Sequence, residues 1–472
     1  MSKIESFEIE NPPQKRLSKF YDDNDEDEDE DEDDVTNDNN SNTNDINYSN
    51  KKKSNNELKT LKSFLRFKGD NEFYGVINLL ASAIGSGCVT FPSLLQTAGV
   101  ITSLLIFIIV SISIYFSLDL LRNFIISTNL FSFAEITQKI LGNKWLKIYA
   151  FSSFIFYLSM EINYINLIVE YGAKGLLSID KTYLFVIFYL SSCIIEIILC
   201  LFISKMSHIH ILSLISIICF TFVVVSLLIY SIFIINNETK EKFSSEKLFM
   251  PLSDSILKYI ISIFSCFIEF VYSYSCHSSF PTLIGNLKTK EEKTKKVVNI
   301  FFSTILIMYI FIAIFGYISQ INPVEKHKTL ILFSNDSLQG FFNYVLQIII
   351  LLFFLCLIPI RFIVLRDNYK SMFTFDITYK IDLIFISVNM ILANIISYFC
   401  QSDSNIIFSL NEIFGGIFGV VICFVLPVLT YISINKKGEI KSILGYIMAI
   451  FYLIIGLFTA GYSFSEKIIK VI

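Results

Sequence analysis

Long apolar stretches separated by short polar segments fill the chain from residue 72 onward. A helix needs about 20 mostly apolar residues to cross the hydrocarbon core of a bilayer. Eleven stretches reach that length, and polar or charged residues separate them. They lie near 72–98, 100–121, 145–170, 182–203, 209–235, 255–284, 297–319, 339–363, 381–400, 405–433 and 441–463. The pattern predicts an all-α polytopic membrane protein with eleven transmembrane helices.

Composition supports this class and excludes others. Of 472 residues, 53% are hydrophobic and only 17% are charged, which is too apolar for a soluble protein of this length. No phosphate-binding loop, HExxH motif or GxSxG motif is present, so we expect neither an enzyme nor a nucleic-acid-binding protein. The nine cysteines show no CxxC pairing and are interpreted as small buried apolar residues. We expect no metal and no cofactor.

The first 70 residues differ from the rest. Twelve of the thirteen residues from Asp22 to Asp34 are acidic, and an Asn/Ser/Asp-rich stretch follows. Such a composition buries too little apolar surface to offset the entropy of ordering, so residues 1–70 are expected to be a disordered cytoplasmic tail. The tail is either a solvated low-complexity insert or a docking segment whose partner is unknown. Residues 71–472 form the transmembrane domain.

The distribution of basic residues predicts the orientation. A run of Lys and Arg from Lys51 to Lys68 precedes the first apolar stretch, and such runs stay on the cytoplasmic side. With the amino terminus inside, 24 Lys and Arg, Arg361 among them, fall on that side and ten on the other. The sequons at Asn237 and Asn335 fall on the outer or lumenal side. A plasma membrane and an acidic vacuole-like or lysosome-like membrane both fit.

A short block recurs in the first and sixth apolar stretches. Phe91-Pro92-Ser93-Leu94-Leu95 matches Phe280-Pro281-Thr282-Leu283-Ile284. The copies are five helices apart, so their helices run in opposite directions, which predicts an inverted repeat of 5+5 helices with one more at the end. Proline lacks an amide proton, so Pro92 and Pro281 are expected to free the carbonyls four residues earlier, those of Cys88 and His277.

Interrupted helices at matching positions of two halves are typical of the central site of a transporter. There, amino ends of half-helices face an anionic group and unwound carbonyls face a cation. An amino acid presents both charges. The repeat therefore predicts a binding site for a small zwitterion at the two breaks.

Several segments carry a family resemblance. The first is Val76-Ile77-Asn78-Leu79 through Ala83-Ile84-Gly85-Ser86-Gly87, then Phe91-Pro92 and Ala98-Gly99. The second is Cys276-His277-Ser278-Ser279-Phe280-Pro281, followed by a Lys-rich segment, Val297-Val298-Asn299-Ile300 and Phe315-Gly316-Tyr317. Further matches are Ile358-Pro359-Ile360-Arg361, Ile413-Phe414-Gly415-Gly416 and Leu426-Pro427. Over residues 71–463 the chain resembles the amino acid/auxin permease (AAAP) family.

The resemblance implies the LeuT-like fold of the amino acid–polyamine–organocation superfamily and transport by alternating access. By position, it places an amino-acid site at residues 84–88 and 274–278. These are Ile84, Gly85, Ser86, Gly87, Cys88, Tyr274, Ser275, Cys276, His277 and Ser278.

The candidate coupling residues favour a proton over sodium. The resemblance implies that sodium-coupled members of the family use an Asn four residues before the Gly-Ser-Gly and a hydroxyl in the eighth span. This chain has Ala81 at the first position, and residues 348–360 of the eighth span contain no Ser, Thr or Asn. Ionisable residues within spans are functional candidates by default. Glu269 is the first candidate for proton coupling, followed by Glu161 and His277. Facilitated exchange without an ion is the alternative.

Together these features predict a secondary active transporter of neutral or aromatic amino acids, proton-coupled or facilitative. Two alternatives stay open: a membrane nutrient sensor with a transporter fold, and a carrier of another small zwitterionic or cationic solute. Asp119 and Arg122, at the end of the second span, are expected to anchor it or to pair.

Overall fold

The computed structural model describes residues 72–177, 181–202, 209–237, 255–285, 291–319, 337–372, 379–400, 404–434 and 440–465. The expected tail, residues 1–70, and the sequon residue Asn335 lie outside this part of the chain. Within it, ten helices are long and apolar enough to cross a membrane, and a bent pair supplies an eleventh span. The prediction of eleven transmembrane helices is confirmed.

The spans follow one another along the chain. In chain order they are α3 (Glu72–Ala83) with η1 (Ser86–Thr90) and α4 (Phe91–Ala98), α5 (Val100–Thr128), α7 (Asn143–Val169) with η2 (Glu170–Leu176), α8 (Thr182–Phe202), α9 (Ile209–Asn237), α11 (Ile256–Ser273) with α12 (Phe280–Gly285), α13 (Glu291–Ser319), α14 (Ser337–Met372), α15 (Tyr379–Cys400), α16 (Ser404–Phe414) with η5 (Gly415–Gly419), η6 (Val421–Val425) and α17 (Leu426–Ile434), and α18 (Ile440–Ser463). A short helix that the sequence pattern did not predict, α6 (Phe133–Leu141), connects α5 to α7.

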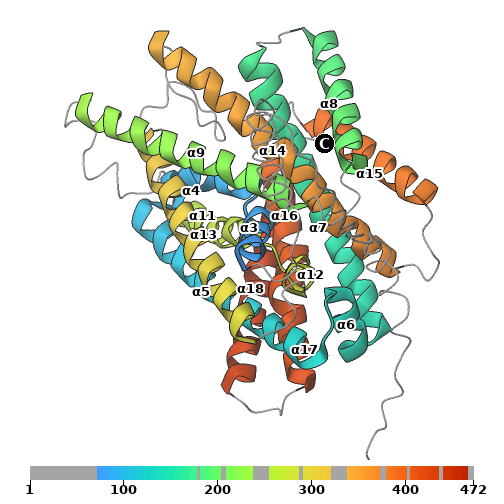
Figure 1. Cartoon of the computed structure of the whole chain (residues 1–472). Coiled ribbons are helices and arrows are strands. Elements are labelled where there is room, and N and C mark those ends of the chain that lie inside the picture. The colour runs from blue at the N-terminus through green and yellow to red at the C-terminus, as the bar shows by residue number, and fades with distance from the viewer. Residues whose placement is uncertain are drawn as a thin grey trace, which may run out of the picture. The chain divides into compact units, whose positions relative to one another are not determined.

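Burial separates central helices from peripheral ones. Every residue of α3 from Tyr74 to Ala83 is buried, and Figure 1 shows this helix in the middle of the bundle. The peripheral helices instead expose large apolar side chains, such as Ile112 on α5, Leu190 on α8 and Ile229 on α9, each more than 60% exposed. Apolar surface of this extent is unfavourable in water and suits a hydrocarbon environment.

Two spans are broken near their middle. Helical order stops at Ile84 and Gly85, and the axes on either side differ by 58°. The second break separates the end of α11 at Ser273 from the start of α12 at Phe280. Pro92 and Pro281 are each the second residue of the helix that resumes, where a missing amide proton removes no helical hydrogen bond.

The first break corrects one expectation from the sequence. The carbonyl of Cys88 is not left free by Pro92, because the backbone amide of Phe91 donates to it. The chain tightens into a 3-10 turn over residues 86–90, and this turn brings a donor three residues away into reach. Pro92 therefore starts the next helix without leaving this carbonyl unsatisfied.

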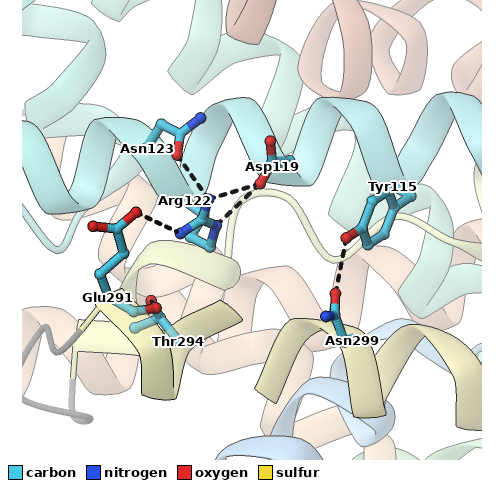
Figure 2. A network of polar contacts seen from close by, with 7 residues as sticks. All are labelled: Tyr115, Asp119, Arg122, Asn123, Glu291, Thr294 and Asn299. Atoms are coloured by element: carbon cyan, nitrogen blue, oxygen red, sulfur yellow. Dashed lines mark hydrogen bonds and ion pairs between the residues drawn. The ribbon is translucent and has the colours of Figure 1, made fainter. Parts of the chain in front are cut away.

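One end of the bundle is held by polar contacts between α3, α5 and α13. As expected, Arg122 pairs with Asp119 on α5, at 2.9 Å, and its guanidinium also lies 3.9 Å from the Glu291 carboxylate on α13 (Figure 2). Lys296 of α13 reaches the Glu72 carboxylate at the start of α3, at 2.7 Å. These contacts connect the beginning of the broken first span to two unbroken helices.

The last span packs against the tenth through a pair of glycines. A Cβ atom at Gly416 would lie 2.8 Å from the carbonyl oxygen of Gly456, and a Cβ at Gly456 would overlap the backbone of Gly416. Only glycine at both positions permits this approach of α18 to η5. Gly461, on the same helix, has nothing within 4 Å of its Cβ direction.

We expect Gly456→Ala to destabilise the folded protein by about 1–3 kcal/mol, because the added methyl group meets rigid backbone atoms. Gly461→Ala is the matched control and should leave the stability unchanged or slightly raised, since alanine favours a helix. Melting of the detergent-solubilised protein measures both. Equal melting temperatures for the two variants would contradict the packing described here.

Candidate functional site at the two helix breaks

The two breaks meet in the interior of the bundle. All ten residues that the sequence assigns to the site are buried. A Cβ atom at Gly87 would lie 3.1 Å from the Cα atom of Ser273, the last residue of α11. The backbones of the first and second breaks are thus in direct contact, and a larger residue at position 87 would separate them. The structure therefore brings the two predicted segments, 84–88 and 274–278, to one place.

A tyrosine from a third helix joins the ends of both interrupted helices. The hydroxyl of Tyr309, on α13, donates to the carbonyl oxygens of Ala83 at 3.3 Å and Ser273 at 2.8 Å. These carbonyls belong to the last residues of α3 and α11, where no further helical turn supplies a donor. The Tyr309 side chain is fully buried. One phenol, whose single proton is shared between two carbonyls, therefore joins backbone groups of both breaks in the buried interior.

An arginine that the sequence analysis counted on the cytoplasmic side, at the end of the eighth span, also lies at the breaks. Arg361, on α14, is 0% exposed. Its Nε donates to the hydroxyl of Tyr164 at 3.2 Å, and its Nη1 donates to the carbonyl of Ser275 at 3.2 Å. Its Nη2 lies 3.5 Å from the position of a Cβ at Gly85. Counting Arg361 among the loop charges was wrong, because α14 continues for more than two turns beyond it.

Aromatic rings cover the breaks along α4 and α11. Tyr274 stacks against Phe107 of α5, with ring centroids 5.9 Å apart, and its hydroxyl hydrogen-bonds to Ser111 at 3.0 Å. The Phe91 ring lies 5.0 Å from the rings of both Phe270 and Tyr309. This aromatic cluster closes the site on the side of α4 and α11, toward Ala98 and Ile256.

A small cavity of about 30 Å³ approaches the breaks from the opposite direction. It is lined by Ser82, Ser132, Ile209, Ser278, Ser279, Thr282, Leu283, Ile360, Ile363 and Val364. Of the ten predicted site residues, Ser278 lines it. These residues come from α3, the second break, α12, the second half of α14 and the start of α9, together with Ser132 just before α6. The site is therefore approached along the halves α3 and α12, on the side that the charge distribution predicts to be cytoplasmic.

The three candidates for proton coupling do not form one cluster. His277 lies in the second break, is 0% exposed, and neither ring nitrogen has a hydrogen-bond partner within the described residues. Glu161 lies on α7, three residues before Tyr164, and is likewise 0% exposed with both carboxylate oxygens unbonded there. Glu269 is 1% exposed and lies one turn before the end of α11.

Another buried glutamate, Glu196, shows what a hydrogen-bonded carboxylate looks like in this bundle. Glu196 of α8 accepts from Ser192 at 2.7 Å and from Asn394 of α15 at 3.0 Å. It lies within electrostatic range of Glu161. Glu161 therefore differs from Glu196: the Glu196 carboxylate accepts two hydrogen bonds, and the Glu161 carboxyl accepts none within the described residues.

Comparisons with known proteins agree with this architecture. The family model described as "Transmembrane amino acid transporter protein" matches residues 68–469. A putative amino acid transporter AAT1 of Plasmodium berghei (strain Anka) is 26% identical over 310 residues, which are 62% of this chain and 46% of that protein. The chain thus spans about half the length of the curated relative it matches.

Solved structures show the same fold. The manganese transporter of Eremococcus coleocola, in complex with an aromatic bis-isothiourea substituted compound, has a TM-score of 0.52 at 11% identity, covering 86% of this chain and 89% of that one. A Na⁺-coupled sialic acid symporter in a substrate-bound outward-open state has a TM-score of 0.50 at 13% identity, covering 83% and 89%. At such identities the likeness shows the fold alone. It confirms the predicted LeuT-like arrangement of 5+5 helices plus one.

Removing the Tyr309 hydroxyl should weaken the junction of the two breaks. We expect Tyr309→Phe to lower the free energy of unfolding by about 1–3 kcal/mol, because buried carbonyls lose their donor. Tyr115→Phe is the matched control: its hydroxyl donates to Asn299 near the surface, at 2.8 Å, so its loss should cost little. Melting in detergent compares the two, and an unchanged melting temperature for Tyr309→Phe would count against the junction.

Proposed function

The chain belongs to the family of transmembrane amino acid transporter proteins, and from that membership we propose that it is a secondary carrier of neutral or aromatic amino acids working by alternating access. It is a multi-pass integral membrane protein of a transporter family, and we assign it no enzymatic activity. The observation that carries the proposal is the contact between two broken helices at matching positions of the two halves.

The proposed substrate site comprises residues 84–88 and 274–278. A zwitterion needs donors for its carboxylate and acceptors for its ammonium group, and a helix break exposes backbone groups of both kinds. Gly85 and Gly87 let the Tyr164 hydroxyl and Ser273 come close to the backbone of the first break, since neither position carries a side chain. The surrounding rings of Phe91, Phe107 and Tyr274 suit an apolar or aromatic side chain.

We further propose that the amino terminus is cytoplasmic and that the cavity beside α12 is the path to the cytoplasm. The aromatic cluster then closes the outer side, so the conformation described here has its access on the inner side. Alternating access would require the cluster to open while α3 and α12 close the cavity. The membrane itself is a plasma membrane or an acidic vacuole-like or lysosome-like membrane.

For coupling, we propose a proton or no ion. The stretch of α14 between residues 348 and 360 lacks the hydroxyls and amides that a hard cation would use as ligands. The positive charge of Arg361, next in the chain, disfavours a second cation close by. Glu161 and Glu269 are buried carboxyls that could gain and lose a proton during the cycle, and Glu161 has the less satisfied environment.

Uptake into proteoliposomes tests the function. With a panel of radiolabelled amino acids, sodium absent and a pH gradient imposed or withheld, we expect saturable uptake of one or more neutral or aromatic amino acids. A proton-coupled carrier takes up more when the gradient is present. If a folded, oriented protein binds these amino acids but moves none of them, the carrier proposal fails and a sensor with this fold takes its place.

Carboxyl variants assign the coupling. Glu161→Gln and Glu269→Gln keep the side-chain size and remove the titratable group, so the variant of the coupling residue should lose the stimulation by the gradient but keep exchange of labelled for unlabelled substrate. Glu292→Gln, on the exposed first turn of α13, is the control and should behave as the wild type. Stimulation that survives in both buried variants would overturn proton coupling through these carboxyls.

A further inference from the structure

Arg361 carries a positive charge without a counter-charge. Ion pairs within the described residues include those of Arg122 with Asp119 and Glu291 and of Lys296 with Glu72, and none is found there for Arg361. A fully buried guanidinium is expensive in an apolar interior unless it is paired or hydrogen-bonded. Two neutral acceptors, the Tyr164 hydroxyl and the Ser275 carbonyl, satisfy only part of its five donors.

The unsatisfied part of the guanidinium faces the substrate site. Within the described residues Nη2 has no hydrogen-bond partner, and it lies 3.5 Å from the position of a Cβ at Gly85, at the first break. Ser86 follows Gly85 in the chain and is 4% exposed, and its hydroxyl has no partner among these residues either. Two buried donors without acceptors therefore lie at or beside Gly85, at one end of the proposed site.

We propose that Arg361 recognises the substrate carboxylate, with Nη2 as the charged donor and the Ser86 hydroxyl as a second donor. This inference rests on the proposed function and specifies its ligand class: solutes with a free carboxylate. A carboxylate supplies the counter-charge that the guanidinium lacks, and hydrogen bonds between charged partners are about twice as strong as neutral ones. Amines and polyamines, which have no carboxylate, are rejected by the same charge.

The geometry separates this role from a structural one. Nε and Nη1 already hold Tyr164 and the second break in place. A purely structural arginine would not need a third nitrogen left unbonded at the first break. The charge also makes a cation-binding centre at this position unfavourable, which agrees with the lack of oxygen ligands in residues 348–360.

The test compares each amino acid with its carboxamide, which has the same side chain and ammonium group but no carboxylate. Binding of L-leucine, L-phenylalanine, L-leucinamide and L-phenylalaninamide to the purified full-length protein is measured for the wild type, Arg361→Gln and Arg361→Lys. For the wild type we expect the acid to bind about 10- to 100-fold more tightly than its amide. Arg361→Gln should weaken binding of the acid by a much larger factor than binding of the amide, so that the preference falls toward one, while Arg361→Lys retains part of the preference.

Tyr164→Phe is the control variant, because it removes a partner of Arg361 but keeps the guanidinium. It is expected to keep the preference for acid over amide even if both bind more weakly. The proposal is overturned if Arg361→Gln weakens acid and amide by the same factor, which is the result of a structural role. It is also overturned, without any variant, if the wild type binds an amide as tightly as its acid. A wild type that binds neither leucine nor phenylalanine nor any other amino acid contradicts the proposed function itself.

Discussion

Backbone groups at the two helix breaks set the main constraint on this structure. In an apolar interior, an unsatisfied carbonyl costs several kcal/mol, so a helix can break there only where other groups replace its hydrogen bonds. Here the replacements come from side chains of unbroken helices. Tyr309 donates to the ends of α3 and α11, and Arg361 donates to Ser275 within the second break. The helices α7, α13 and α14 are thus fixed around the breaks.

This constraint links the fold to the proposed transport. Tyr309 and Arg361 hold the backbone of the site in place. The helix segments on the two sides of the breaks differ in what covers them. Aromatic rings close the α4 and α11 side, and a cavity lies along the α3 and α12 side. The beginning of α3 is held to α13 by Lys296 and Glu72, and this half-exposed ion pair can separate at small cost. This ion pair therefore adds little to the cost of moving the start of α3.

Much of this architecture is legible in the sequence. Apolar length gave the eleven spans, and the repeated Phe-Pro block located both breaks, because proline and glycine act locally on the backbone. The position of Arg361 was not predicted, since a basic residue near the end of an apolar stretch normally lies at the membrane surface, and only the continuation of α14 buries it. The bonding of the Cys88 carbonyl was also missed, because it depends on a 3-10 turn and not on the proline. Contacts such as Gly416 with Gly456 join distant segments, and no local pattern indicates them.

The central claim is that the two breaks together form one binding site for an amino acid. The most direct measurement is an experimental structure of the protein with L-leucine or L-phenylalanine bound. The account predicts ligand density between residues 84–88 and 274–278, with the carboxylate beside Arg361 and Ser86. Ligand density confined to the cavity along α12, or a carboxylate directed away from the guanidinium, would contradict it.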